Sequence, residues 1–157
     1  MFTIGYRRRS AFSLVELVVV VVILGVIAAI ALPRMSRGAA GAADAGLATD
    51  LSVMRSAIEL YRSEHAGTYP SVANIVNQLT QYTNEAGATS ATASATHIYG
   101  PYLTRVPTLK VSANRGNSGI AAAAGAGVGW IYDETAGTII ANSGTDTDSS
   151  GTLYSAY

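Results

Sequence analysis

The stretch RRRSAFSLVELVVVVVILGVIAAIALP, residues 7–33, decides how this chain is built. The 21 residues from position 12 to position 32 form an apolar run that only Ser13, Glu16 and Gly25 interrupt. A helix needs about 20 apolar residues to cross the hydrocarbon core of a bilayer. We therefore expect a transmembrane helix over residues 12–32.

Glu16 is the one charged residue inside this run. A carboxylate at the centre of a membrane-embedded helix costs about 2.5–3.5 kcal/mol even on insertion-based scales, so such residues usually have a function. Glu16 lies near the start of the helix, where a side chain can also reach back to the lipid headgroups. The residue is therefore a candidate functional group, with a purely interfacial position as the alternative.

Basic residues flank the run unequally. Arg7, Arg8 and Arg9 precede it, whereas Arg34 and Arg37 follow it closely. The positive-inside rule then places the N-terminus in the cytoplasm and the chain beyond the apolar run on the outside. A conventional secretory signal is the alternative, but its apolar region usually has about 7–15 residues, and this run is longer.

The composition limits what the rest of the chain does. With 157 residues there is room for one anchoring segment and one small domain. The formal net charge is +0, which gives no electrostatic basis for binding nucleic acid. The chain has no cysteine, so a disulfide framework, a thiolate metal site and a cysteine nucleophile are all excluded.

Catalytic motifs do not stand out. His65 and His97 are isolated, and the sequence contains neither an H-E-x-x-H zinc motif nor a G-x-S-x-G nucleophile elbow. The glycine-rich residues 125–129 are followed by Trp130, where a dinucleotide site needs its third glycine. We therefore expect no enzymatic activity, and a membrane-anchored periplasmic binding or enzymatic domain is the alternative from another class.

An amphipathic helical pattern follows the apolar run. Apolar side chains recur at spacings of four, three, four and three residues, namely Leu47, Leu51, Met54, Ile58 and Tyr61. We expect this helix to continue the first one over residues 33–62 and to pack its apolar stripe on a small domain. Arg55 and Glu59 are spaced for an i,i+4 ion pair.

Proline and glycine work against a continuous helix. Pro33 removes one backbone hydrogen bond and clashes with the preceding turn, so a kink or local melting is expected there. Gly38, Gly41 and Gly46 each lower helix stability, so a flexible tether between the two parts is the alternative. The small residues of this stretch also permit close approach between helices.

The C-terminal part predicts a small globular head over residues 63–157. Gly67 suits the end of the long helix, and Pro70 forces an extended backbone before it. The further expected elements are a short helix over residues 72–82, loops over 87–96 and 113–127, and antiparallel strands over 129–133 and 137–142. The predicted fold class is α+β: a long N-terminal helix, transmembrane in its first half, and a head containing a short antiparallel β-sheet.

Residues 10–17, SAFSLVEL, resemble the class III signal of type IV pilins and type II secretion pseudopilins. The resemblance implies that a prepilin peptidase cuts between Ala11 and Phe12 and methylates the new amino group. This family almost always has glycine before the cut, where this chain has Ala11. The implied organisation is a leader over residues 1–11, a transmembrane and assembly helix over 12–32, its amphipathic continuation over 33–62, and a periplasmic head over 63–157.

The same resemblance gives Glu16 a partner. After the cut, the new amino terminus at Phe12 lies four residues from Glu16, and a protonated amine in a low-dielectric filament core offsets the desolvation of the carboxylate. The helix macrodipole also favours an acid in the first turns. If subunits stack with a stagger, the amine belongs to a neighbouring subunit. Glu16 and Pro33 are therefore the candidate assembly residues.

Three further motifs resemble the major pseudopilin branch. They are G-x-Y-P at residues 67–70, G-P-Y-L-x-x-x-P at 100–107 and G-W-x-Y-D at 129–133. The implied function is that of a structural subunit of a type II secretion pseudopilus, which supports protein export from the inner membrane; a type IV pilus subunit is the alternative. The implied partners are prepilin peptidase, further copies of the chain, minor pseudopilins, the lipid bilayer, and an inner-membrane assembly platform with a cytoplasmic ATPase.

The C-terminal segment carries two alternating acids, Asp146 and Asp148, among turn-forming residues. Major pseudopilins have a calcium-binding loop near this position, so the resemblance implies that both are candidate Ca²⁺ ligands. Calcium takes six to eight oxygen ligands, and two carboxylates supply few of them. A solvated loop without metal is therefore the favoured interpretation.

Overall fold

The computed structural model describes residues 13–157, and within this range the side chains of residues 32–37 are not described. The fold is α+β, as the sequence predicts. Its elements, in chain order, are α1 (Leu14–Glu64), α2 (Ile75–Thr80), β1 (Tyr82–Thr83), β2 (Thr89–Ser90), β3 (Gly119–Ala121), β4 (Val128–Asp133), β5 (Thr138–Ala141) and the 3₁₀ helix η1 (Tyr154–Ala156). The chain divides into two units, Met1–Ala39 and Ala40–Tyr157.

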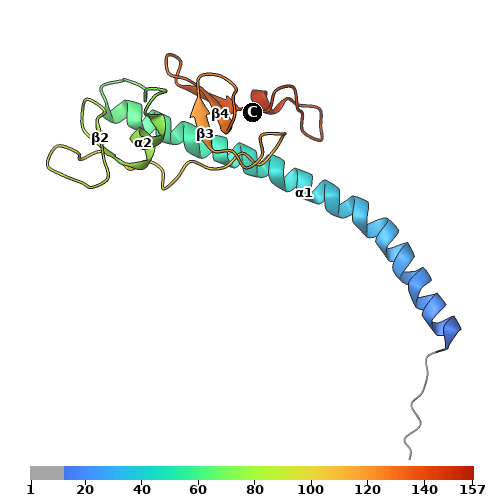
Figure 1. The fold of residues 1–157 in the computed structure, drawn as a ribbon. Coiled ribbons are helices and arrows are strands. Elements are labelled where there is room, and N and C mark those ends of the chain that lie inside the picture. The colour runs from blue at the N-terminus through green and yellow to red at the C-terminus, as the bar shows by residue number, and fades with distance from the viewer. Residues whose placement is uncertain (1–12) are drawn as a thin grey trace, which may run out of the picture. The chain divides into compact units, whose positions relative to one another are not determined.

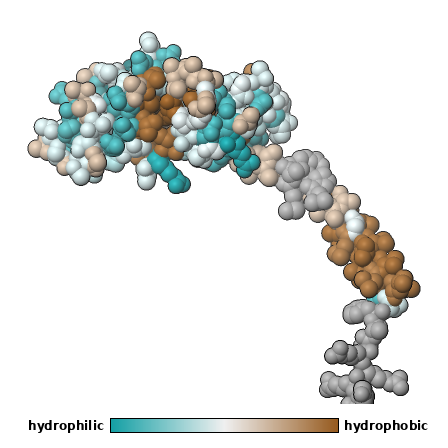
Figure 2. Space-filling model, in the orientation of Figure 1, coloured by the Kyte–Doolittle hydropathy of each residue, from teal (hydrophilic) through white to brown (hydrophobic). Residues whose placement is uncertain are grey.

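The first unit contains the apolar start of α1. The amide groups of Glu16 and Leu17 donate to Ser13 O at 3.1 and 3.2 Å, which closes the first turn. The segment Leu14–Ala31 has a mean hydropathy of 3.1, none of it is buried, and it is long and apolar enough to cross a membrane. Figure 2 shows this part of the helix as an almost unbroken hydrophobic surface.

Helix α1 is assigned without interruption from Leu14 to Glu64. The backbone is helical at Pro33, so the predicted local melting is wrong, whereas the predicted kink stays a prediction. Gly38, Gly41 and Gly46 also lie within the helix. The helical neighbours on both sides outweigh the cost of each glycine, which is about 1 kcal/mol.

The second unit, residues 40–157, contains the predicted head together with the second half of α1, and from here on we call all of it the head. It is built on the predicted apolar stripe of α1. Its five members are each at most 2% exposed: Leu47, Leu51, Met54, Ile58 and Tyr61. They pack in one core with Trp130, Tyr132 and Ile139 from the C-terminal sheet and with Ile75 and Leu79 from α2. Figure 1 shows α2, β3 and β4 lying along the part of α1 that belongs to this unit.

The C-terminal end of α1 is a Schellman-type turn. The amide of Gly67 donates to Arg62 O at 2.9 Å, which is the six-to-one hydrogen bond of that motif. Gly67 has φ +84°, so its predicted place near the helix end is confirmed. Ala66 precedes it with φ +52°, a left-handed conformation that residues with a Cβ rarely adopt. The chain therefore turns over two residues before it returns along the core.

The main sheet has the order β3-β4-β5. Strands β4 and β5 form the predicted antiparallel hairpin, with Trp130 opposite Ala141 and Asp133 opposite Thr138. The short second helix is also confirmed, although α2 covers only Ile75–Thr80. A separate antiparallel pair joins β1 to β2.

Two short strands lie where the sequence predicted loops. β2 lies within residues 87–96, and β3 lies within residues 113–127 and pairs with β4 in parallel. Both strands have only two or three residues, and their sequences contain Gly, Ala, Ser and Thr without the alternation that marks a strand. At Gly119 a Cβ atom would lie 2.6 Å from Gly127 O, so this glycine is what allows the close backbone approach of β3.

Candidate functional site

Glu16 lies in the first turn of α1 and is exposed. It is the only charged residue of positions 13–31. The first backbone amides of a helix have no partner within the helix, and their dipoles favour a negative charge at this end. The structure therefore places one carboxylate at the N-terminal end of a helix surface that carries no other charge.

This helix surface is apolar on every side. Thirteen large aliphatic side chains between Leu14 and Ile30 are 49–78% exposed. Full burial of one such side chain contributes about 1.5–3 kcal/mol, so a surface of this size does not stay in contact with water. The segment must be covered by lipid, by other protein chains, or first by lipid and later by protein chains.

The predicted processing residues, Ala11 and Phe12, lie outside the described residues, as does the side chain of Pro33. The pairing of Glu16 with the amino group of Phe12 therefore stays a prediction. Glu16 itself lies in the first turn of α1, four residues after Phe12 in the sequence.

The comparison with protein families bears directly on this segment. Residues 6–32 match the prokaryotic N-terminal methylation motif. The chain carries a type IV pilin-like prepilin signal. The match supports a membrane-anchored, pilin-like subunit that prepilin peptidase processes and that polymerises. It covers the N-terminal segment only, and neither the search of curated proteins nor that of solved structures found a match to the chain.

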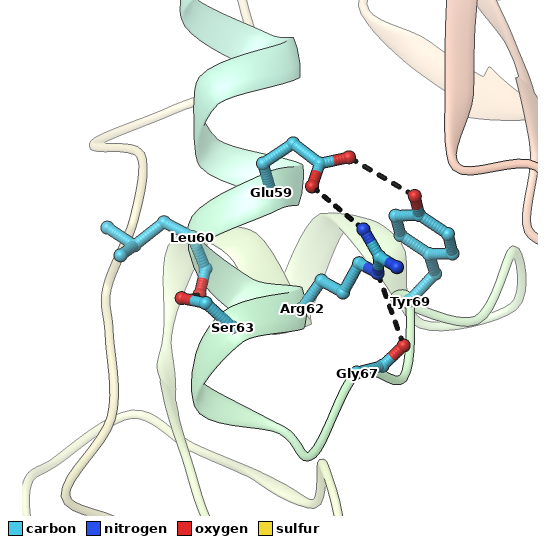
Figure 3. Close-up of polar contacts among 6 residues, drawn as sticks. All are labelled: Glu59, Leu60, Arg62, Ser63, Gly67 and Tyr69. Atoms are coloured by element: carbon cyan, nitrogen blue, oxygen red, sulfur yellow. Dashed lines mark hydrogen bonds and ion pairs between the residues drawn. The ribbon is translucent and has the colours of Figure 1, made fainter.

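A polar cluster fixes the turn after α1 (Figure 3). Arg62 Nη1 donates to Glu59 Oε2 at 3.3 Å, and Tyr69 Oη donates to Glu59 Oε1 at 3.2 Å. The guanidinium carbon of Arg62 also lies 4.8 Å from the centre of the Tyr69 ring, within the range of a cation–π contact. The cluster is exposed and contributes modestly to stability, and its role is to hold the returning chain against the helix.

The predicted Arg55–Glu59 ion pair is wrong. Arg55 Nη2 instead donates to two backbone oxygens, Tyr157 O at 2.6 Å and Ile139 O at 3.2 Å. Glu59 pairs with Arg62 one turn later. The spacing rule fails because Arg55 has acceptors from β5 and the C-terminal residue within reach, which no local pattern reveals.

Tyrosine hydroxyls make further contacts with carboxylates in the head. Tyr154 Oη donates to Asp44 Oδ1 at 2.7 Å, and Tyr102 Oη donates to Glu64 Oε2 at 2.7 Å. The hydrogen bond to Asp44 is the main cause that raises the pKa of Tyr154 to about 12, and burial is the main cause that raises the pKa of Tyr102. These tyrosines tie the later segments of the head back to α1.

His65 is a core residue. It is 3% exposed, its ring stacks on Tyr61 with centroids 3.8 Å apart, and Nε2 lies 3.0 Å from Thr83 Oγ1. His97 lies apart from it on an exposed loop, with Nδ1 3.1 Å from Ser94 Oγ. The described contacts of the two histidines thus involve different residues.

The C-terminal acids differ in their environment. Asp148 Oδ1 accepts hydrogen bonds from Ser150 N and Thr152 N, each at 2.8 Å, and from Ser150 Oγ, while Oδ2 accepts from Tyr157 Oη at 2.6 Å. The hydrogen bond from Tyr157 is the main cause that holds the pKa of Asp148 well below its usual range. Asp146 is exposed, and none of the described donors reaches its carboxylate.

This arrangement offers few of the six to eight oxygen ligands that calcium takes. Both carboxylate oxygens of Asp148 already accept hydrogen bonds from other groups of the chain. In the described part of the molecule, no group of three or more His, Cys, Asp or Glu side chains comes together. Calcium binding by Asp146 and Asp148 stays the less favoured prediction, and a loop without metal stays the favoured one.

Proposed function

We propose that the chain is a structural subunit of a type II secretion pseudopilus, which supports protein export. It polymerises through its N-terminal helix after prepilin peptidase has cut before Phe12 and methylated the new amino group. The observation that carries this proposal is the match of residues 6–32 to the methylation motif. The single acid of this segment, Glu16, lies in the first turn of an apolar helix whose aliphatic side chains are exposed.

The proposal includes an orientation. Before processing, α1 spans the inner membrane once, with the leader arginines in the cytoplasm and the head in the periplasm, as the positive-inside rule favours. After processing, the same apolar surface leaves the lipid and packs among copies of itself. Its partners are the peptidase, minor pseudopilins, and an inner-membrane assembly platform that a cytoplasmic ATPase drives.

The assignment to a pseudopilus, as opposed to a type IV pilus, rests on the three head motifs. In the head these motifs contact one another: Tyr132 Oη donates to Pro70 O at 3.0 Å, and Trp130 Nε1 donates to Pro107 O at 2.8 Å. Motifs that are far apart in the sequence thus build one frame around the core. This common role supports their use as a family signature.

The first test is the intact mass and N-terminal peptide of the chain recovered from membranes. The proposal expects a chain that begins at Phe12 and carries one added methyl group. A chain that begins at Met1, or one that is cut after Pro33, contradicts it. Deletion of the gene should then abolish protein export while leaving surface fibres intact, whereas loss of the fibres would favour a type IV pilus subunit.

A further inference from the structure

An open groove with a volume of about 990 Å³ lies on the head beside β3. Its apolar lining comes from Val53 on α1, Val76 on α2, and Val106 and Pro107 on the loop before β3. We call it the β3 groove. Val53 and Val76 are 48% and 40% exposed, so both side chains contact solvent. Figure 2 shows a hydrophobic area between the parts of the head that Figure 1 labels α2 and β3.

The β3 groove carries an excess of one positive charge. Lys110 and Asp50 both line it, and their charges compensate each other because Lys110 Nζ lies 2.6 Å from Asp50 Oδ2. Arg105 also lines the groove and is exposed. No described carboxylate forms an ion pair with Arg105. The groove therefore offers an apolar floor and one cation without a partner among the described residues.

The C-terminal loop, residues 144–153, has the complementary properties. Leu153 is 43% exposed, and its backbone pairs with Thr147, which brings it close to Asp146. Asp146 carries an exposed carboxylate that pairs with none of the described cations. The hydrogen bonds to Asp148 hold the loop in one shape. An apolar side chain and an acid thus project from a preorganised loop.

The groove and the loop lie at opposite edges of the main sheet. Ser118 and Gly119, at the start of β3, line the groove. The C-terminal loop leads into η1, which packs against β5, the strand at the other edge. A contact between the groove of one copy and the loop of another is therefore heterologous, and contacts of this kind repeat into open filaments unless they close a ring.

We infer that the β3 groove receives the C-terminal loop of a neighbouring copy of this chain. Leu153 covers the exposed valines, and Asp146 faces Arg105. The inference rests on the proposed filament function and adds to it a contact between heads. In this arrangement the N-terminal helices hold the filament together, and the groove contact sets the spacing of neighbouring heads.

Thiol crosslinking in intact cells tests this contact, because the full chain has no cysteine of its own. The variant Thr108→Cys places a thiol in the groove, and Ser149→Cys places one on the loop. With a short bifunctional maleimide, the double variant should give a ladder of multimers, whereas co-expression of the two single variants should give dimers only. The matched control replaces Ser149→Cys with Ala91→Cys, an exposed site on another loop, and should give no ladder.

A charge exchange provides the second test. Arg105→Glu or Asp146→Arg alone should reduce the ladder at least fivefold, and the two together should restore it. Arg115→Glu and Glu85→Arg are the matched controls, since both residues are exposed charges outside the groove and the loop. Equal ladders from all variants, or from the Ala91 control, would overturn the inference.

The proposed function has a separate readout in the same cells, namely the mass of the N-terminal peptide and the sedimentation of sheared filaments. A chain that is methylated at Phe12 and sediments, yet gives no ladder, overturns the groove contact alone. A ladder without methylation supports the contact and contradicts the filament proposal. The absence of a ladder, of methylation and of sedimentation contradicts both.

Discussion

At the scale of single residues, Glu16 makes membrane insertion less favourable, yet we expect filament assembly to need it. Glu16→Leu should improve membrane insertion, because it removes a charge that costs about 2.5–3.5 kcal/mol near a helix centre and less near its end. It should nevertheless abolish filament assembly, because the Phe12 amine then has no carboxylate to pair with. The measurement compares the membrane fraction with sheared filaments, with Val20→Leu as a control of similar volume change in the same helix. Normal filaments from Glu16→Leu would favour a simple anchor.

Asp148 gives a prediction about pH. Its pKa is held below the usual value by hydrogen bonds to the charged form, so its contribution to stability is present above the unfolded pKa of about 3.9 and is lost as the pH falls further. Asp148→Asn should lower the thermal midpoint of the head at pH 7. The difference from the unsubstituted chain should shrink below about pH 4, as followed by circular dichroism in detergent. Asp146→Asn is the control, and a constant difference across this range would contradict the assigned role.

The carboxylate Glu16 was predictable from the sequence because a charge within an apolar run is conspicuous. The contacts of Arg55, Asp44 and Lys110 were not predictable. Their partners are Tyr157, Tyr154 and Asp50, from 60 to 110 residues away in the sequence. Pairing at such distances depends on how the chain returns along α1, which no local spacing encodes.

At the scale of elements, the two faces of α1 in the head should respond differently to truncation. Met54 is 0% exposed and belongs to the core, whereas Val53 is 48% exposed and lines the β3 groove. Met54→Ala should destabilise the head by about 2–5 kcal/mol, because it leaves a cavity. Val53→Ala should cost less than about 1 kcal/mol, and chemical denaturation of both variants measures the difference. Similar losses from both would mean that Val53 also has a buried role.

The elements themselves were predictable to different degrees. The stripe from Leu47 to Tyr61 recurs with the period of a helix over four turns, and β4 and β5 alternate around a turn, so local pattern is enough for both. β3 contains Gly119 and Ala121 and has no such pattern. It exists because Gly119 allows close pairing with β4, and pairing between distant segments is not a local property.

At the scale of the whole molecule, the two units differ in what they need in order to be stable. Every residue of the head core lies between Leu47 and Ala141, so the described core draws on residues 40–157 alone. The apolar surface of Leu14–Ala31, in contrast, is exposed throughout and depends on lipid or neighbouring copies. The described core of the head thus needs no residue before position 40, whereas the apolar segment needs lipid or other chains around it.

This difference gives the last prediction. A fragment of residues 40–157 should fold without detergent, melt cooperatively, and elute as a monomer at micromolar concentration, because a single groove contact is weak without the N-terminal helix to hold copies together. The measurements are circular dichroism and size-exclusion chromatography with light scattering. The matched control is the same fragment with Trp130→Ala, which removes a fully buried side chain and should cost about 3–5 kcal/mol, enough to unfold a small domain. A fragment that aggregates, or melts without cooperativity while the full chain melts sharply, would show that the head takes part of its stability from the apolar helix.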